Sequence, residues 1–151
     1  MNLGEVLLPE SFRTGSKDGS YHVGLQLSHL LQEDPSRPGN GWGLFVRGGF
    51  SDGNPNPFQS WISGGIGGKG LWDARPDDAF GVGAFFYRAS DQLRDTLNPL
   101  IDLGDEYGME FYYDFPLTPW MNVGLDLQII NSLRSAADSA IIGGLRTHLR
   151  F

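Results

Sequence analysis

Apolar and polar residues alternate along most of this chain with the period of a β-strand. The repeat is clearest in residues 121–129, where every second residue is apolar and those between are small or polar. Side chains two residues apart share one face of a strand, so such a segment predicts a strand with one apolar and one polar face. Six further segments show the same alternation: residues 21–32, 41–51, 59–71, 79–90, 107–115 and 140–151. The first dozen residues add a further candidate strand, although Pro9 interrupts it.

The last segment indicates what surrounds the two faces. Arg146, His148 and Arg150 share one face, while the opposite face stays apolar up to Phe151, the final residue. A soluble domain buries its apolar face and exposes the polar one, whereas an outer-membrane barrel turns the apolar face to lipid and the polar face to a water-filled lumen. A terminal aromatic residue in register with the last strand is typical of such barrels. We therefore expect an all-β transmembrane antiparallel β-barrel.

The connectors between the segments support this expectation. Residues 91–105 and 131–139 are long, residues 73–78 and 116–119 are short, and only residues 33–40 depart from the alternation of lengths. Outer-membrane barrels have short periplasmic turns and longer external loops. We therefore expect the short turns and Phe151 at the periplasmic end, with residues 13–20 and 51–58 outside. An aromatic girdle is expected near the short turns, formed by Trp42, Trp72, Phe115 and Trp120.

Composition narrows the possible partners. The net charge of -7 makes nucleic acid an improbable partner, and the absence of Cys fits a chain that crosses an oxidising compartment. A membrane-spanning helix needs about 20 consecutive apolar residues, and charged or polar residues interrupt every apolar run in this sequence. Any contact with a membrane is therefore expected to be made by strands.

Several stretches of the sequence resemble one family in its own order. They are residues 43–54, the turn 75–78 with the strand that follows it, the hairpin 110–130 and the final strand. Together they are similar to the carbohydrate-selective porins of the OprB family. The resemblance implies a barrel of sixteen strands in an outer membrane that lets small sugars diffuse passively. The implied partners are small carbohydrates, outer-membrane lipid, the assembly machinery that would receive the strand ending at Phe151, and further copies of the chain in a homotrimer.

The length of the chain differs from that expectation. At about 10 residues for each tilted strand, 151 residues supply seven or eight strands, about half of such a barrel. Residues 1–10 carry neither a basic segment nor an apolar stretch of the kind that opens a secretory signal. We therefore expect residues 1–151 to be a single porin segment from the C-terminal part of a longer chain, without its N-terminal half and signal peptide.

Some motifs imitate enzyme and metal sites without satisfying them. The glycine-rich residues 65–70 lack the Ser or Thr of a phosphate loop and the following helix of a dinucleotide loop. Residues 52–63 begin like a calcium loop but have Pro57 and Ser63 where Gly and Glu are required. The three His residues have no ligand spacing. The expectation is no enzyme activity, no catalytic residue, no metal site and no cofactor.

If the apolar rows face lipid, the polar rows line the pore. Sugars suit such a wall, because their hydroxyls exchange water for charged and amide partners while their C–H faces stack on aromatic rings. The alternative for any one charged residue is that it pairs across the wall and only stiffens it. The candidate pore-lining, sugar-contacting residues are Arg47, Lys69, Tyr87, Glu110, Tyr112, Asp114, Asp126, Gln128, Arg146 and Arg150.

Two other classes of protein stay open at this point. One is a complete small barrel of about eight strands with a structural or adhesive role and a lumen plugged by side chains. The other is a soluble antiparallel barrel or sandwich that binds a ligand inside and turns its apolar rows inward. The length of the coding sequence separates the first from the porin, and solubility without detergent separates the second.

Overall fold

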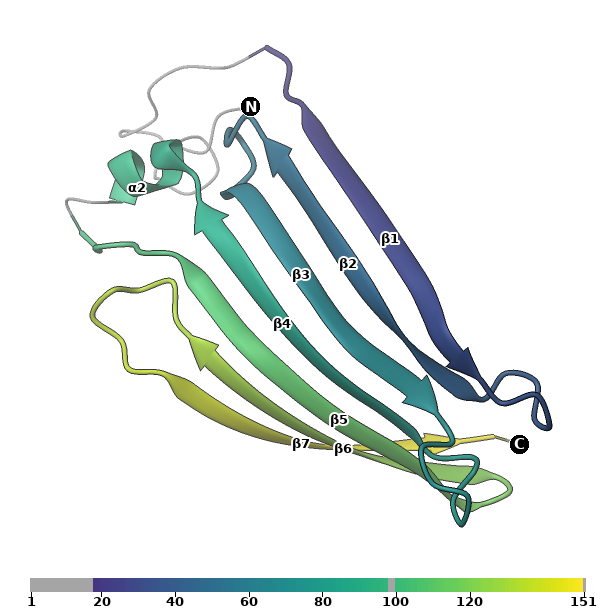
Figure 1. The fold of residues 1–151 in the computed structure, drawn as a ribbon. Helices are drawn as coiled ribbons and strands as arrows, with labels where there is room; N and C mark the ends of the chain where they lie inside the picture. Colours follow the sequence, from purple (N-terminus) through teal and green to yellow (C-terminus); the bar gives the residue numbers. More distant parts are fainter. Residues whose placement is uncertain (1–17, 98–99, 151) are drawn as a thin grey trace.

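The computed structural model describes residues 18–97 and 100–150. Their strands form a single antiparallel sheet. It has seven strands in the order of the sequence, so each strand pairs with the one before it and the one after it. Figure 1 shows the strands side by side in one curved layer. Their bounds are β1 His22–Glu33, β2 Gly41–Ser51, β3 Phe58–Lys69, β4 Ala79–Ala89, β5 Glu106–Thr118, β6 Met121–Asn131 and β7 Ala140–Leu149.

Each of the seven alternating segments predicted from the sequence forms a strand. The all-β antiparallel fold is confirmed, and β2 has the predicted bounds 41–51. The candidate strand in the first dozen residues lies outside the described residues, as do most of the connector 13–20 and Phe151. No helix among the described residues is long and apolar enough to cross a membrane.

One predicted turn is shorter than the sequence suggested. The sequence predicts a short connector over residues 116–119, but β5 continues through Pro116 to Thr118. Pro116 pairs with Asn122 on β6, while the pairing of β5 with β4 has already ended at Asp114 and Ala79. Since Pro lacks an N–H group, it is tolerated where a strand has lost one of its neighbours. The turn itself is therefore tighter than predicted and centres on Pro119 and Trp120.

The connectors divide between the two ends of the sheet. Figure 1 shows the β1–β2, β3–β4 and β5–β6 connections at one end with the C-terminus, and the other three connections at the opposite end. The short turns and the end of β7 thus lie together, as the alternation of lengths predicted. The arrangement also determines at which end of the sheet each aromatic residue lies. Trp42, Trp72 and Trp120 all lie at the end of the short turns.

The long connector after β4 is more ordered than the sequence analysis expected. It contains the helix α2, Asp91–Leu97, which Ser90 caps by accepting a 3.0 Å hydrogen bond from the N–H of Leu93. Leu93 packs with Ala89 in a small apolar cluster. The cap, the acidic first turn and two leucines four residues apart are helix signals that the sequence analysis did not use. Partly buried Leu97, Leu103 and Leu133 complete the cluster, so it joins this connector to the one after β6.

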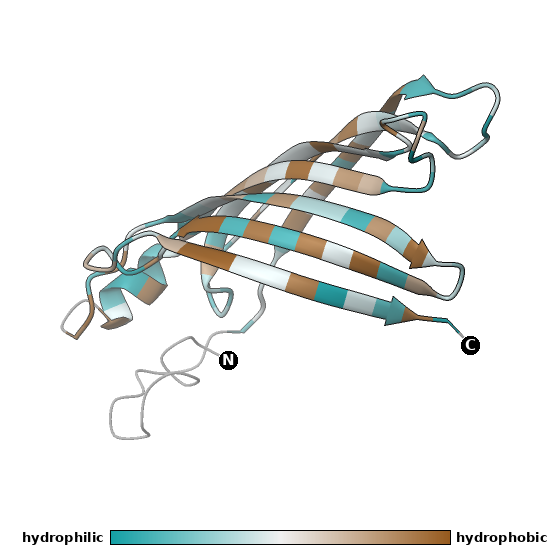
Figure 2. Ribbon diagram, turned by 90° about the horizontal axis from the view of Figure 1, so that it is seen from below, coloured by the Kyte–Doolittle hydropathy of each residue, from teal (hydrophilic) through white to brown (hydrophobic). Residues whose placement is uncertain are grey.

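The strand register places most large aliphatic side chains on one face, although Leu30, Ile130 and Ile142 lie on the other. Figure 2 shows hydrophobic and hydrophilic bands alternating along each strand. Large apolar side chains on one face are open, with Leu25 67%, Ile141 73% and Leu145 74% exposed. Among the described residues the only buried large or methyl-bearing apolar side chains are Ala89 and Leu93, both at the α2 end. None of the described residues forms a second layer over the apolar face, so a nonpolar solvent must cover it.

Crowding distinguishes the inner face of the curved sheet. On β4 the apolar-face residues Val82 and Phe86 are exposed, whereas Phe85 and Tyr87 on the other face are half-buried. The rings of Phe85 and Tyr87 lie 5.2 Å apart, centroid to centroid. Side chains converge on the concave side of a curved sheet, so the polar face is the inner one.

A polar cluster closes the turn between β3 and β4. Asp78 is 3% exposed and accepts a 2.6 Å hydrogen bond from Nε of Arg75 and another from the hydroxyl of Tyr113 on β5. Arg75 also lies over the ring of Phe115, with its guanidinium carbon 5.3 Å from the centroid. The hydrogen bond from Arg75 lowers the pKa of the Asp78 carboxyl below its ordinary value. The ionised carboxylate thus ties the turn to the second half of β5.

Replacing Asp78 by Asn is expected to lower the unfolding temperature by a few degrees at neutral pH, because the amide accepts weaker hydrogen bonds than the carboxylate. A carboxyl whose pKa is lowered by folding stabilises the fold above its ordinary pKa of 3.8 and loses that contribution as the pH falls through the lowered value. The difference between D78N and wild type should therefore shrink below about pH 4. Heat-modifiable migration on gels from detergent at several pH values measures it. A difference that is constant down to pH 2 would contradict the assignment.

Candidate pore wall

The register places the predicted pore-lining residues on the inner face. Cross-strand pairs link Gln26 with Arg47, Lys69 with Ala79, Tyr87 with Glu106, and Asp114 with Gly124. Because directly paired residues point to the same side of a sheet, these pairs and the alternation along each strand define one face. That face carries Arg47, Lys69, Tyr87, Glu110, Tyr112, Asp114, Asp126, Gln128 and Arg146. Arg150 follows β7 with the same alternation, and its N–H donates a 2.9 Å bond to the carbonyl of Trp120.

Two neighbouring rows cross the middle of this face. The first, called the Phe45 row, runs through directly paired residues Ser28, Phe45, Gly65, Gly83, Glu110 and Gln128. The second, called the Tyr112 row, runs through Gly43, Gly67, Gly81, Tyr112 and Asp126. In both rows the central strands β3 and β4 contribute only glycine, so the wall is thin in its middle. Polar or aromatic side chains flank these glycines on both sides in the Phe45 row. In the Tyr112 row they lie on the β5 and β6 side, because Gly43 and its partner Leu30 occupy the other.

The charged residues fall into separate groups along the face. A hollow of about 200 Å³ brings Glu110, Asp114, Asp126 and Arg146 together on β5, β6 and β7. Asp126 accepts a 3.0 Å hydrogen bond from the side-chain amide of Gln128. This group places carboxylates, a guanidinium and an amide within one patch, which offers both donors and acceptors to a polar solute.

Arg47 and Lys69 lie apart from that patch. Nε of Arg47 donates a 2.9 Å hydrogen bond to the hydroxyl of Ser63 on the neighbouring strand. Lys69 lies at the end of the short turns, where its ammonium is 3.2 Å from a carboxylate oxygen of Asp77. The predicted set therefore shares one face but does not form a single cluster, and Lys69 is placed at one end of the wall.

Tyr87 is less available than its prediction implied. Its ring packs against Phe58 at 5.0 Å and Phe85 at 5.2 Å between centroids, so much of its area contacts neighbouring rings rather than the lumen. The sequence analysis did not single out Ser28, Ser63 or Phe85 for this face. Counting every second residue through the segments 21–32, 59–71 and 79–90 would have found all three.

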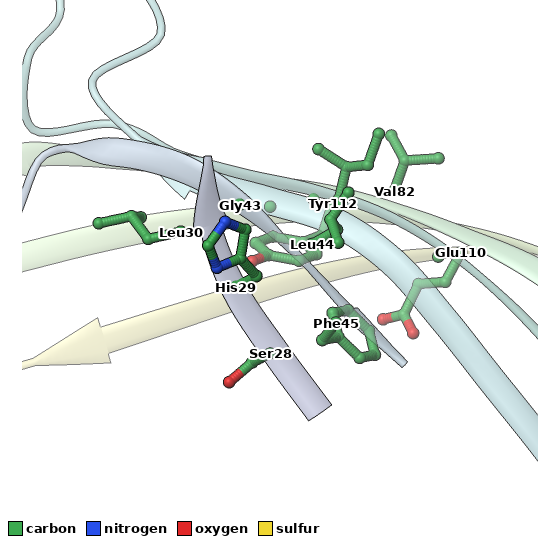
Figure 3. A pocket seen from close by; sticks show the side chains of 13 residues that line it. Ser28, His29, Leu30, Gly43, Leu44, Phe45, Val82, Glu110 and Tyr112 are labelled. Carbon is green, nitrogen blue, oxygen red and sulfur yellow. The ribbon is translucent and has the colours of Figure 1, made fainter. Parts of the chain in front are cut away.

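A larger hollow lies over the glycines. Its volume is about 440 Å³, and its lining combines aromatic, carboxylate and hydroxyl side chains from β1, β2 and β5. Figure 3 shows Phe45 and Glu110 projecting to one side of the sheet and Val82 to the other. The hollow belongs to the inner face through Ser28, Phe45, Gly81, Glu110 and Tyr112.

Comparison with known proteins identifies the family of this chain. The profile of the family described as carbohydrate-selective porin, OprB family, matches residues 3–151. The chain belongs to this family. It is 30% identical over 154 aligned residues to Porin B of Pseudomonas aeruginosa, an alignment covering 91% of this chain and 33% of that protein. The chain thus spans about a third of the length of this curated relative.

A solved structure agrees with the fold. The structure of Pseudomonas putida OprB at high pH superposes with a TM-score of 0.75 at 24% identity, covering 83% of this chain and 34% of that one. The family membership confirms the resemblance drawn from the sequence and the outer-membrane location. The description of the family is that of porins and not of enzymes, and the absence of catalysis in this chain stays a prediction.

The orientation of the two faces can be tested by thiol labelling, because the chain has no native Cys. In liposomes, Gln128→Cys should react readily with a charged, membrane-impermeant thiol reagent, since its side chain faces water. Leu127→Cys, the adjacent residue on the same strand, should be protected by lipid and instead be reached by a lipid-soluble reagent. Mass spectrometry of the labelled protein gives both rates. Equal labelling of the two variants by the charged reagent would show that the faces are wrongly assigned.

Proposed function

We propose that this chain forms part of the wall of a water-filled pore through which small sugars diffuse passively across an outer membrane. The observation that carries the proposal is the division of one sheet into an open apolar face and a polar inner face bearing the hydrogen-bonding groups. Lipid covers the first, and water with dissolved solute fills the space beside the second. The family description supplies the solute class, because its members are carbohydrate-selective porins.

The chemistry of the inner face suits sugars because no single group dominates it. Carboxylates such as Glu110 and Asp126 accept hydrogen bonds from sugar hydroxyls, whereas Arg47 and Arg146 donate to them. A solute that loses part of its hydration finds replacement partners along the wall, and each contact is weak enough to release it. Passive diffusion requires this balance, since one tight site would stop flux.

Both alternative readings of the sequence meet an obstacle in the sheet. A complete small barrel closes by pairing its two edge strands, but among the described residues the edge strands β1 and β7 lie at opposite sides of the sheet (Figure 1). A soluble barrel needs the apolar face inside, but that face is the open one, with Leu25 67% and Leu145 74% exposed. The sixteen-strand barrel, a homotrimer and recognition of the terminal strand by assembly machinery stay part of the proposal.

The lumen can be narrowed from inside. Gly124 faces the pore, and a Cβ built there meets ordinary contacts, the nearest at 3.7 Å. Gly124→Trp in the natural gene product that contains this chain should slow glucose entry into liposomes severalfold, because the indole occupies pore cross-section. Swelling rates in isotonic glucose measure this. The matched control is Gly143→Trp on the lipid face, where a Cβ meets nothing within 4 Å.

The control separates a pore effect from a folding defect. Gly143→Trp should leave the swelling rate unchanged, and both variants should show the heat-modifiable migration of a folded barrel. Equal loss of glucose entry in the two variants would contradict the assignment of the inner face. No glucose entry in the wild-type protein would overturn the proposed function itself.

A further inference from the structure

The hollow of about 440 Å³ on the inner face has an unusual lining. Phe45 and Tyr112 reach into it from strands on either side of the glycine-only centre of β3 and β4. Both rings are open to the lumen, with Phe45 37% and Tyr112 43% exposed. Aromatic area facing water is unfavourable unless a solute covers it, so the two rings point to a ligand with an apolar surface.

The position of Tyr112 depends on glycine beneath it. A Cβ placed on Gly81, its directly paired residue, would lie 2.1 Å from Cε1 of the ring. Its hydroxyl reaches further, to 3.5 Å from the position of a Cβ on Gly67 of β3. The ring therefore runs along the wall from β5 across β4, and any side chain at Gly81 would push it into the lumen.

Phe45 approaches from the opposite side in the neighbouring row. Its Cε1 lies 3.1 Å from the position of a Cβ on Gly65, and its Cζ lies 4.0 Å from that of Gly83. The two rings thus lie over four glycines in adjacent rows, one from β2 and one from β5. Together they make a shallow aromatic surface with a floor that consists of backbone.

Polar groups flank this surface. Glu110 follows Gly83 in the Phe45 row, and Ser28 precedes Phe45 at its other end. Both side chains are exposed and line the hollow. A carboxylate accepts two or more hydrogen bonds from hydroxyls, and a serine hydroxyl both donates and accepts. A pyranose ring has the matching form, with C–H groups on its face and hydroxyls around its rim.

We propose that this hollow is a subsite in which a pyranose ring stacks on Tyr112 and Phe45 while its hydroxyls bind Glu110 and Ser28. The proposal rests on the sugar-pore function above and names the part of the wall that distinguishes ring sugars from open-chain polyols. A linear polyol offers the same hydroxyls without a rigid C–H face, so the aromatic contacts favour the ring. Gly81 is a positioning residue, because it acts through Tyr112.

The test uses the natural gene product that contains this chain, reconstituted in planar bilayers. Block of the ion current by D-glucose and by sorbitol gives an apparent dissociation constant for each. Wild type should bind glucose more tightly than sorbitol. Tyr112→Leu or Phe45→Leu should weaken glucose binding about two- to fivefold while the binding of sorbitol stays the same. Tyr112→Phe, which keeps the ring, should retain the preference for glucose.

Gly81→Ala tests the geometry with both rings present. It should weaken glucose binding as Tyr112→Leu does, because the added methyl group displaces the ring. The matched controls are Tyr107→Leu, which replaces a tyrosine on the lipid face of β5, and Gly143→Ala, where a Cβ meets nothing within 4 Å. Both should leave the dissociation constants of glucose and sorbitol unchanged.

Two results would overturn the subsite and leave the pore function standing. In the first, the wild-type protein passes sugar but binds glucose and sorbitol equally. In the second, the Leu variants at Tyr112 and Phe45 fold and bind glucose like wild type. A wild-type protein that passes no glucose overturns the pore function as well. Because Phe45 and Tyr112 lie on different strands, a folding failure of one variant leaves the other to decide.

Discussion

The continuous ladder of backbone hydrogen bonds is the constraint on which the rest of this structure depends. In hydrocarbon an unpaired N–H or C=O group costs several kcal/mol, so a segment that crosses a membrane as strands must pair along its whole length. The register of β2 with β3 runs unbroken from Gly41 and Lys69 to Phe50 and Ser60. Once the ladder satisfies the backbone, each side chain is free to match the solvent on its own face.

Two solvents then select two sets of side chains on the same strands. Leucine, isoleucine and aromatic residues on the outer face need no partner from the protein, because lipid covers them. This explains how the described residues fold with no buried apolar layer beyond the cluster at Ala89 and Leu93. On the inner face the requirement is different, since water remains there and side-chain volume sets the width of the passage. Glycine at the centre of both inner rows meets that requirement.

The end of the sheet that carries α2 is stabilised differently from the middle. Arg94 forms an ion pair with Asp105, and Asp105 also accepts a 3.1 Å hydrogen bond from the N–H of Ala89. The N–H of Gly104 donates a 2.7 Å bond to the carbonyl of Leu133, which links the connectors after β4 and β6. These connectors lie beyond the strands, where water competes for every polar group, so they need an apolar cluster and salt links of the kind that soluble domains use.

The sequence predicted the features that depend on the two-residue alternation of side chains. It missed the features that depend on contacts between residues far apart in the chain. Alternation located all seven strands and assigned the predicted pore-lining residues to one face, because a period of two residues is a local property. It could not show that Lys69 pairs with Asp77, that Tyr87 packs against Phe58 and Phe85, or that Pro116 lies beyond the edge of β4. It also left α2 inside a connector, since tertiary packing of Leu93 against Ala89 supports that short helix.

The irregularities in strand pairing are confined to the ends of strands. Register shifts occur between Leu30 and Gln32, between Phe58 and Ser60, and between Pro116 and Thr118, each near the end of a strand. A shift of one residue in the middle of a strand would exchange its two faces, placing carboxylates in lipid and leucines in the pore. Bulges at the ends change the connection without that exchange. The same uninterrupted register that keeps the outer face apolar therefore also holds Phe45, Glu110 and Tyr112 in adjacent rows.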